Sequence, residues 1–324
     1  MPKTKRVLII CLACLLVITT AAVYLLKANN SSRAGEHFVD ERVELIALIF
    51  RLAGRPEYSR THNRYQRSLN RNFRRFSDHP AVEYARDLPL GFDAVTNFAI
   101  HMKRDGDKFA LIENRSFLFS CERWTTESTE IFIDLVNDFY IDTEFAAFFQ
   151  SNIPYYVRRT NRFVRDLYRR LDKDWFYAHG VRPDQIRVIL SSSIWGGYGP
   201  SIHDADGNIE ASYSILQVSR SYRNQKWFLV HEIAHSFANP IAEAWYAEDE
   251  AFRRLSDNSV DLNRMPWYAT GLTMAREYVT RAFTILYRVE VEGARPARLF
   301  REERRNGFPD IQQVYEMVVA YVNR

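Results

Sequence analysis

The feature that most constrains the fold is one five-residue segment, His231-Glu232-Ile233-Ala234-His235. Two histidines four residues apart lie one above the other on an α-helix, so both rings can bind one metal ion. Glu232 follows the first histidine, beside the position that a catalytic zinc ion keeps for water. Zinc lowers the pKa of that water towards about 7, and a nearby carboxylate can accept its proton during attack on a carbonyl. The segment predicts a zinc-binding helix with His231 and His235 as ligands and Glu232 as general base.

The residues before this segment predict that the helix enters the protein interior. Trp227-Phe228-Leu229-Val230 is a wholly apolar run. Imidazole and carboxylate groups that follow such a run into the interior need polar partners or a metal. The alternative is an ordinary helix with two incidental histidines, because a short motif of this kind also arises by chance. The apolar run favours the metal site.

A catalytic zinc ion takes three protein ligands, so a third must come from elsewhere in the chain. A histidine six residues after His235 is excluded, since position 241 is Ile. Asn239-Pro240 predicts the end of the helix, because proline disfavours a helical conformation in the residue before it. A carboxylate from a second helix is then required. The nearest acidic residues form a charge run typical of a solvated face: Glu243, Glu248, Asp249 and Glu250.

Glu277 is the better candidate for the third ligand. It lies 42 residues after His235 (277 − 235), in a segment whose apolar spacing predicts a helix packed on the core. The apolar residues of that segment are Met274, Tyr278, Ala282, Ile285 and Val289. Arg281 follows one turn later and would hold the carboxylate in place, as groups behind zinc ligands commonly do. An ordinary surface Glu–Arg pair at four-residue spacing explains the same pattern, so spacing alone leaves both interpretations open.

Four stretches carry a resemblance that extends over roughly residues 40 to 324. They are Glu44–Gly54 with Pro56-Glu57-Tyr58, Tyr198-Gly199-Pro200, His231–Pro240, and Glu277–Ala282 with Gly307-Phe308. In them the chain resembles a family of bacterial proteins of unknown function grouped with the gluzincins, metallopeptidases in which a distant Glu completes the zinc site. The resemblance implies His231, His235 and Glu277 as ligands. It also implies Glu232 as the base, and it implies no substrate.

The N-terminal residues predict a membrane segment. Lys3, Lys5 and Arg6 precede an uncharged run from Val7 to Leu26, twenty residues (26 − 7 + 1). At 1.5 Å per residue such a helix is about 30 Å long, the thickness of a bilayer's hydrocarbon core. The positive flank stays cytoplasmic, so the body is expected outside the cytoplasm. The run is interpreted as an uncleaved signal-anchor or a cleaved signal peptide of a secreted protein, with a lipoprotein signal as a third alternative.

The length after the leader allows one large exported domain or two small ones, and a sizeable core is expected, since 47% of the residues are hydrophobic and 14% aromatic. The expected division is a leader at 1–27, a polar tether at 28–36, and a gluzincin-like domain at 37–324 with a helical part (about 37–180) and a metal-site part (about 181–324). Cys121 is the only cysteine after the leader, so no internal disulfide is expected. The net charge of +4 is mild. The arginine cluster in Thr61–Arg75 is interpreted as a solvated helix face, and not as a site for lipid or nucleic acid.

Hydrophobic periodicity predicts an α+β fold that is mostly helical. Helical spacing occurs in residues 40–54, 93–103, 129–150 and 152–172. Gln185–Leu190 and Glu210–Val218 alternate as strands do, and Asp204–Asn208 between them contains an Asp-Gly hairpin signal. A small sheet, with a hairpin near residues 185–218, is therefore expected before the zinc-binding helix.

The resemblance implies that one of these two strands lies above the metal and pairs with the substrate backbone. Gly196-Gly197 and Gly199 either allow a close backbone approach there or form a plain flexible turn. The oxyanion of the tetrahedral intermediate also needs a donor beyond zinc. The sequence does not choose among four candidates for that donor, which are His203, Tyr198, Tyr268 and Arg281.

These observations together predict a zinc-dependent metallopeptidase of gluzincin type with one zinc ion and a peptide or protein substrate. Contact with a membrane is expected through the N-terminal segment, a nucleic-acid partner is not expected, and the oligomeric state is not predicted. The alternative is a non-catalytic domain of the same fold that serves as a binding or structural module of the cell envelope. Glu232 favours the enzyme, because a structural zinc site has no use for a base beside its ligand.

Overall fold

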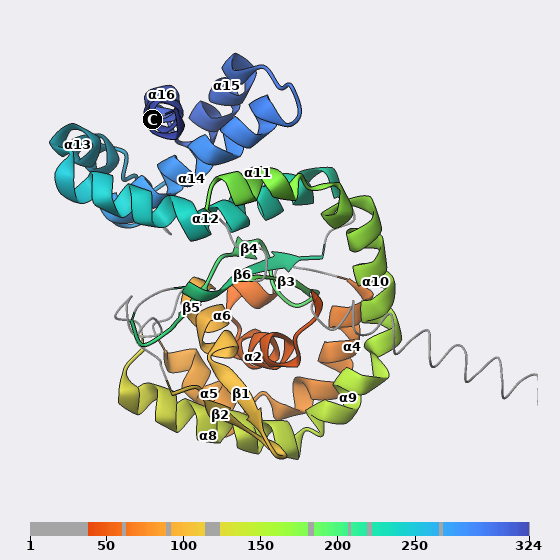
Figure 1. Cartoon of the computed structure of the whole chain (residues 1–324). Helices are drawn as coiled ribbons and strands as arrows, with labels where there is room; N and C mark the ends of the chain where they lie inside the picture. Colours follow the sequence, from red (N-terminus) through yellow and green to blue (C-terminus); the bar gives the residue numbers. More distant parts are fainter. Residues whose placement is uncertain are drawn as a thin grey trace, which may run out of the picture.

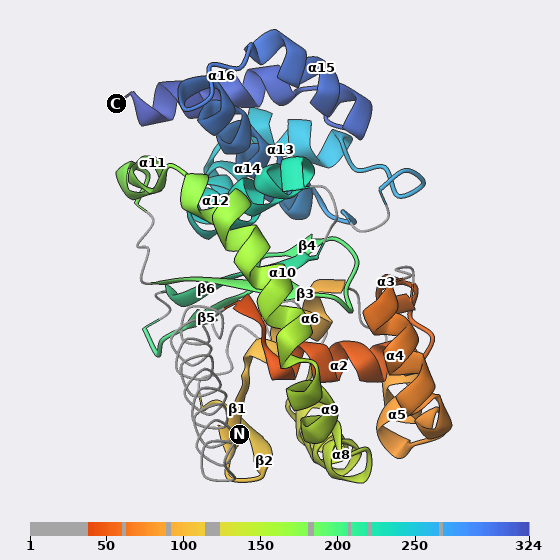
Figure 2. The same ribbon diagram turned by 90° about the vertical axis from the view of Figure 1, so that its right-hand side faces the viewer.

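The computed structural model describes residues 38–59, 63–88, 92–113, 124–180, 185–206, 209–218, 222–265 and 268–323. In this part of the chain the fold is α+β and mostly helical, as predicted. Figures 1 and 2 show three layers, with N-terminal helices on one side of a small sheet and C-terminal helices on the other. Cys121 lies outside the described residues.

The N-terminal layer is built around α2 (Glu41–Leu52), which other helices surround in Figure 1. Val43 and the run from Leu45 to Phe50 are at most 1% exposed, so this helix is buried on every side. An apolar surface around the whole circumference is what such a position requires. The surrounding helices are α3 (Pro56–Ser59), α4 (Arg64–Phe73), η2 (Arg74–Phe76), α5 (Pro80–Asp87), α6 (Phe92–Ile100), α8 (Thr126–Asp142), α9 (Phe145–Ser151) and α10 (Ile153–Asp166).

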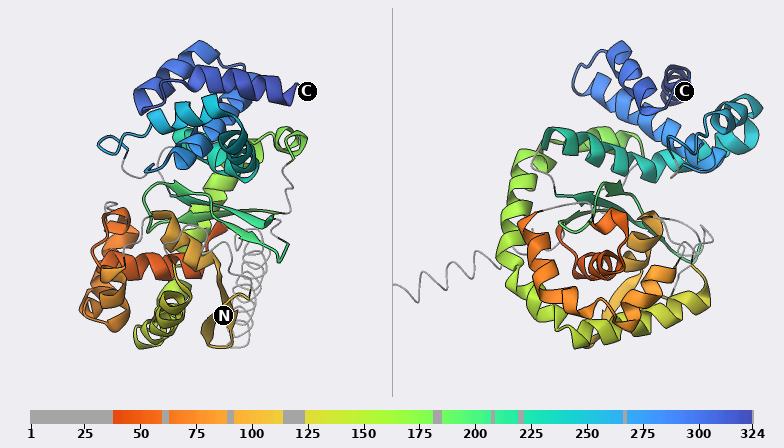
Figure 3. Two further views of the ribbon diagram at one scale, coloured as in Figure 1. Left: turned by 90° about the vertical axis from the view of Figure 1, so that its left-hand side faces the viewer. Right: turned by 180° about the vertical axis from the view of Figure 1, so that it is seen from behind.

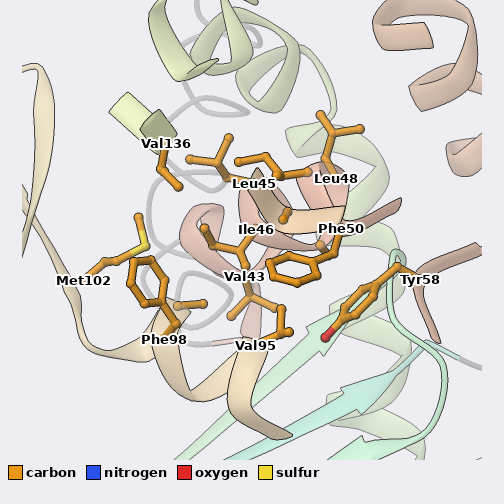
Figure 4. Packing of buried hydrophobic residues seen from close by; sticks show 14 of the residues in the cluster. Val43, Leu45, Ile46, Leu48, Phe50, Tyr58, Val95, Phe98, Met102 and Val136 are labelled. Carbon is orange, nitrogen blue, oxygen red and sulfur yellow. The ribbon is translucent and has the colours of Figure 1, made fainter. Parts of the chain in front are cut away.

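The core of this layer is aromatic and aliphatic (Figure 4). Phe50 of α2 lies 5.9 Å from the ring of Tyr58 and 5.8 Å from that of Phe132, in the tilted and edge-on arrangements that aromatic pairs favour. Val43 lies beside Val95 of α6 in the same cluster. A two-stranded hairpin, β1 (Met102–Asp105) and β2 (Lys108–Leu111), packs against α8 at the edge of this layer.

The central sheet has the strand order β3 (Ile186–Ser191), β6 (Ile209–Gln217), β4 (Gly197–Tyr198). The short strand β5 (Ser201–His203) also pairs with β6. β3 runs parallel to β6, whereas β4 and β5 run antiparallel to it. β4 and β5 therefore form one edge interrupted at Pro200, a residue that sheets tolerate at edges.

The sheet separates two hydrophobic cores. Ile189 and Ile215 belong to the N-terminal core, whereas Val188, Leu190 and Leu216 belong to the C-terminal core. Successive side chains of a strand point to opposite faces, so continuous apolar runs are needed where both faces are covered. The sequence of β3 and the end of β6 meets this requirement.

The C-terminal layer begins with α12 (Tyr222–Glu248), which crosses the sheet and packs on α14 (Gly271–Glu290). Figure 3 shows α13, α14, α15 and α16 on the far side of α12 from the sheet. Tyr278 and Tyr287 of α14 are completely buried in the second core. The other elements are η3 (Tyr168–Arg170), α11 (Lys173–Ala178), α13 (Glu250–Asn258), α15 (Pro296–Asn306) and α16 (Ile311–Val322).

Two local expectations differ from the structure. The two predicted strands are β3 and β6, but they are parallel neighbours, and the Asp-Gly signal follows the short strand β5. β5 has only three residues, which are too few to show an alternating pattern, so the sequence did not indicate this strand. The predicted helix end at Asn239-Pro240 is also wrong, because α12 continues through Pro240 to Glu248. Burial of Ala238 and Ala242 in the second core offsets the roughly 3 kcal/mol that an interior proline costs a helix.

The predicted membrane localisation is corrected by the described helices. The run from Val7 to Leu26, on which that prediction depended, lies outside the described residues. Among the helices that the structure describes, none is both long enough and apolar enough to cross a bilayer. The physical reason is charge: a span needs about 20 consecutive apolar residues, whereas the long helix α14 contains Arg276, Glu277 and Arg281.

Candidate metal centre

Two packed helices bring His231, His235 and Glu277 together. α12 carries both histidines and α14 carries the glutamate. The two imidazole Nε2 atoms are 3.2 Å apart, His231 Nε2 is 3.6 Å from Glu277 Oε2, and His235 Nε2 is 3.4 Å from Glu277 Oε1. Donor atoms at about 2.1 Å from a tetrahedral zinc ion lie about 3.4 Å apart. The three side chains therefore have the spacing of a shared metal ion.

The hydrogen bonds around the group leave its donor atoms directed at one point. His235 Nδ1 lies 2.9 Å from the Asn239 amide oxygen, which only accepts, so Nδ1 carries a proton and Nε2 is the nitrogen that faces the other donors. The Thr280 hydroxyl lies 3.1 Å from the same Nδ1. Glu277 Oε2 is buried and makes no hydrogen bond of regular geometry within the described part of the chain, although Arg281 Nε lies 3.3 Å away. A buried carboxylate oxygen with spare accepting capacity beside two imidazole nitrogens fits a cation.

The electrostatics of the metal-free group are those of a buried ion pair. Burial opposes the charged form of His235, but Glu277 and then Glu232 raise the pKa of this imidazole to about 9. Burial likewise opposes the charged form of Glu277, yet His231, His235 and Arg281 hold its pKa well below the usual range. A proton on His235 thus takes the place of a metal cation between the donors.

Glu232 lies beside this group without belonging to it. It is 5% exposed, and burial raises its pKa while the two histidines oppose that rise. Its carboxylate lies against the glycines of the β4 edge. A Cβ atom at Gly197 would lie 2.8 Å from Glu232 Oε1, and one at Gly199 would lie 3.1 Å from Oε2. Gly197 and Gly199 therefore provide the close approach of β4 to α12, whereas Gly196 (φ 95°) makes no contact with Glu232 and adopts the left-handed conformation of a turn.

Replacing Gly197 with alanine should lower stability because of this contact. The added methyl meets Glu232 Oε1 and lies 3.3 Å from Leu216, and overpacking of this kind costs about 1–3 kcal/mol. Urea unfolding of the Gly197→Ala protein measures the loss. The matched control is the same change in a Glu232→Ala background, where most of the loss should vanish because the carboxylate is gone. Equal losses in both backgrounds would disprove the contact.

Arg281 connects Glu277 to the C-terminal helices. Its Nε lies 3.3 Å from Glu277 Oε2, and its Nη1 lies 2.7 Å from Glu303 Oε2 on α15. The guanidinium also lies 4.1 Å from the centre of the Phe308 ring. Burial lowers the pKa of Arg281, but the two carboxylates outweigh burial and keep it above its ordinary value. Tyr268 interacts with both Glu277 and Arg281.

Removing the charge of Glu303 should lower the affinity for zinc, because Glu303 holds Arg281, which in turn pairs with Glu277. In Glu303→Gln, Arg281 keeps only Glu277 as a full ion-pair partner, and groups behind metal ligands typically change metal affinity by about 10–100-fold. We expect a zinc dissociation constant raised within that range, measured by competition with a chelator. Glu302→Gln is the matched control, since this neighbour is 54% exposed and 3.7 Å from Arg288. Equal zinc affinities of Glu303→Gln and Glu302→Gln would show that Glu303 does not act on Glu277 through Arg281.

Two of the four predicted oxyanion donors are not brought to the group. The Tyr198 hydroxyl donates to the Trp195 carbonyl at 2.7 Å, and its ring belongs to the N-terminal core. Tyr198 points away from Glu232 because its neighbours Gly197 and Gly199 occupy the opposite face of the strand. His203 pairs with Ile209 on β6, whereas Tyr198 pairs with Ile215 on the same strand. Ile209 and Ile215 are six residues apart, which is about 20 Å along a strand. Its electrostatic neighbour is His101.

The nearer acidic residues have other roles. Glu243 lies 2.8 Å from Arg276 in an exposed ion pair, and Glu250 lies 2.6 Å from Arg254 in another. The Asp249 carboxylate caps α13 by accepting hydrogen bonds from two backbone N–H groups. Glu248 is exposed. Within the described residues, only Glu277 joins the two histidines in a group of three metal-binding side chains.

Sequence reasoning missed Asn239, Thr280 and Glu303. Asn239 lies four residues after His235 on the same helical face, a signal that was obscured by the predicted helix end at Pro240. Thr280 and Glu303 have no such signal, since only the packing of α14 and α15 places them.

No protein-family model, curated protein or solved structure matches this chain. The gluzincin resemblance therefore remains a prediction. Function has to be inferred from the chemistry of the site itself.

Proposed function

We propose that the protein is a zinc-dependent metallopeptidase of gluzincin type with His231, His235 and Glu277 as ligands. The observation that carries this proposal is the convergence of two imidazole nitrogens and a carboxylate from two helices, within 3.2–3.6 Å of one another. Two nitrogens and one oxygen are a ligand set of catalytic zinc sites. When bound there, zinc supplies a Lewis acid that polarises a carbonyl and acidifies water.

Glu232 is proposed as the general base. A base works best when its pKa lies near the working pH, and burial shifts the pKa of Glu232 upwards from its ordinary value. The carboxylate accepts a proton from the attacking water and then delivers it to the leaving amine. The Gly197 and Gly199 contacts restrict its position, so less rotamer freedom is lost when it acts.

The edge strand β4 is proposed to bind the substrate backbone. Gly196 O accepts a hydrogen bond from Gln217 N at 2.9 Å, and Pro200 O accepts one from Tyr213 N at 2.8 Å. In an antiparallel pair, bonded positions alternate with positions whose peptide groups point outwards. Gly197 and Gly199 therefore direct their N–H and C=O groups away from β6, where an extended peptide can pair with them. The two strands expected in this role differ from β4: β6 is central in the sheet, and β3 is at the opposite edge.

Tyr268 is proposed as the donor to the oxyanion. Of the four predicted candidates, Tyr268 and Arg281 lie at the site, and Arg281 is engaged by Glu277 and Glu303. Burial and the Glu277 charge raise the pKa of Tyr268, so its hydroxyl stays protonated and able to donate. A preorganised donor of this kind contributes about 10²–10³-fold to the rate.

The decisive test is hydrolysis of a broad peptide library by the zinc-loaded protein, with Glu232→Gln as the matched control. Activity in the wild type and its loss in the variant support the peptidase. Zinc-loaded protein that cleaves no peptide supports the alternative of a non-catalytic module.

A further inference from the structure

The N-terminal layer contains a buried carboxylate that the metal centre does not use. Glu44 of α2 is 1% exposed, in a helix whose other buried residues are mostly apolar. A buried carboxylate is costly unless hydrogen bonds replace its water. Burial raises the pKa of Glu44, whereas the hydrogen bonds that it accepts, including one from Tyr65 of α4, oppose the rise. The positions of its hydrogen-bond donors therefore matter.

The other donors to Glu44 form the turn that follows β3. Oε1 accepts hydrogen bonds from the Ser191 hydroxyl at 2.7 Å and from the Ser192 backbone N–H at 3.0 Å. Oε2 accepts one from the Ser193 hydroxyl at 2.6 Å. Ser191 Oγ also accepts from the Ser193 N–H at 3.1 Å, so its own proton is free to point at Glu44. One carboxylate thus holds three consecutive residues, which we call the serine turn (Ser191–Ser193).

Three further residues of the N-terminal layer bind the serine turn. The Ser192 carbonyl accepts hydrogen bonds from Asn63 Nδ2 at 3.2 Å and from Gln66 Nε2 at 3.1 Å. The Ser192 hydroxyl lies 3.1 Å from the hydroxyl of Tyr155 on α10. The serine turn is therefore fixed to α2, α4 and α10 together. A buried hydrogen-bond network of this kind makes a segment rigid.

The serine turn leads directly into β4. Gly197 is the fourth residue after Ser193, so the two are at most about 14 Å apart. Between them, the Trp195 N–H donates to the Glu57 carbonyl of α3 at 3.1 Å. β4 pairs with β6 through two residues, so few ladder hydrogen bonds hold it in place. Since a Cβ atom at Gly197 would lie 2.8 Å from Glu232 Oε1, a small shift of β4 changes the surroundings of the proposed base.

We propose that Glu44 is a positioning residue of the site, which holds the serine turn on α2 and thereby fixes β4 against Glu232. The geometry of the base and of the edge strand thus depends on a carboxylate of the N-terminal layer. The alternative is that the network only stabilises the fold as a whole. The effect of Glu44 on catalysis rests on the proposed function, whereas its effect on β4 does not.

Amide hydrogen exchange of the full chain tests the positioning role without a substrate. Two amides report on β4: the Trp195 N–H, bonded to the Glu57 carbonyl, and the Gln217 N–H, which donates to the Gly196 carbonyl at 2.9 Å. In Glu44→Leu both should exchange at least about tenfold faster relative to amides of α14, because a hydrogen bond to a charged acceptor is worth about 10–100-fold. An unchanged ratio overturns the proposal and leaves the peptidase intact.

Asn137→Leu is the matched control for Glu44→Leu. Asn137 is 6% exposed and joins α8 to Phe109 of β2 through two hydrogen bonds in the same layer, so its loss should not change the exchange ratio. Ser193→Ala serves if Glu44→Leu does not fold, since it removes one hydroxyl from the serine turn and leaves α2 intact. It should raise the same ratio less strongly, and a wild-type ratio in this variant would then overturn the proposal.

Steady-state kinetics on a peptide library separate this inference from the proposed function. In zinc-loaded protein, Glu44→Leu should raise KM at least about tenfold, because a loosened β4 pairs less well with the substrate backbone. Its zinc content should equal that of the wild type. A lower kcat at unchanged KM indicates only fewer folded molecules and overturns the positioning role. If the wild type cleaves no peptide while the exchange ratio responds to Glu44→Leu, the positioning of β4 stands and the peptidase fails.

Discussion

Glu232→Gln is expected to reduce peptide hydrolysis by at least about 10²–10⁴-fold, the contribution usually made by general acid–base catalysis. Glutamine keeps the shape and hydrogen-bonding capacity of glutamate but cannot accept the proton of the attacking water. Zinc content and melting temperature should hardly change, because Glu232 is not one of the three converging donors. Steady-state rates on a peptide library, with zinc analysis on the same samples, measure the effect.

The pH profile of the wild type gives a second readout of the same base. Glu232 acts only when deprotonated, and burial raises its pKa, so the rate should fall as the pH falls through that raised value. The acid limb belongs to Glu232 and the attacking water as a coupled pair. Equal rates for wild type and Glu232→Gln at every pH would rule out the general-base role.

His231→Ala and His235→Ala should each abolish stoichiometric zinc binding. The wild type is expected to hold about one zinc ion per chain, and each change removes one of two imidazole ligands. The loss of zinc affinity should exceed the roughly 10–100-fold loss that follows removal of a group hydrogen-bonded to a metal ligand. Metal analysis after dialysis measures the stoichiometry. His203→Ala is the matched control and should keep its zinc, because His203 ends β5 and pairs with Ile209 at the start of β6, away from the three converging side chains. A well-folded wild type without affinity for zinc would contradict the metal centre.

Zinc binding should release a proton and strengthen with pH. The pKa of His235 in the metal-free protein is about 9, so a proton must leave this imidazole whenever zinc binds below that pH. The apparent affinity should then rise about tenfold per pH unit towards pH 9, as measured by calorimetry in buffers of different ionisation enthalpy. The same raised pKa stabilises the metal-free fold at pH values below the ordinary range of histidine. That contribution is lost as the pH rises through about 9.

The longer elements were predictable, because a segment of six or more residues is long enough to show its hydrophobic period. The apolar residues of α2, and those of β3 and β6, indicate burial directly, and their spacing separates the helix from the strands. The pairing of β3 and β6 was not predictable as parallel, because β4 and β5 between them are only two and three residues long. Pro240 shows the opposite error, in which a strong local signal is overridden by the packing of α12.

The local sequence determined where two histidines and a glutamate share a helical turn, because spacing along a helix fixes which side chains are neighbours. It left open whether Glu277 was a ligand or half of a surface ion pair. Only the packing of α14 on α12 brings Glu277 within 3.4–3.6 Å of both imidazoles, and the pair with Arg281 at 3.3 Å is present beside them. The tertiary structure also decided that Gly197 and Gly199 lie against Glu232, and that Tyr198 and His203 do not. Side chains from separate elements converge through long-range burial, which no local pattern of residues encodes.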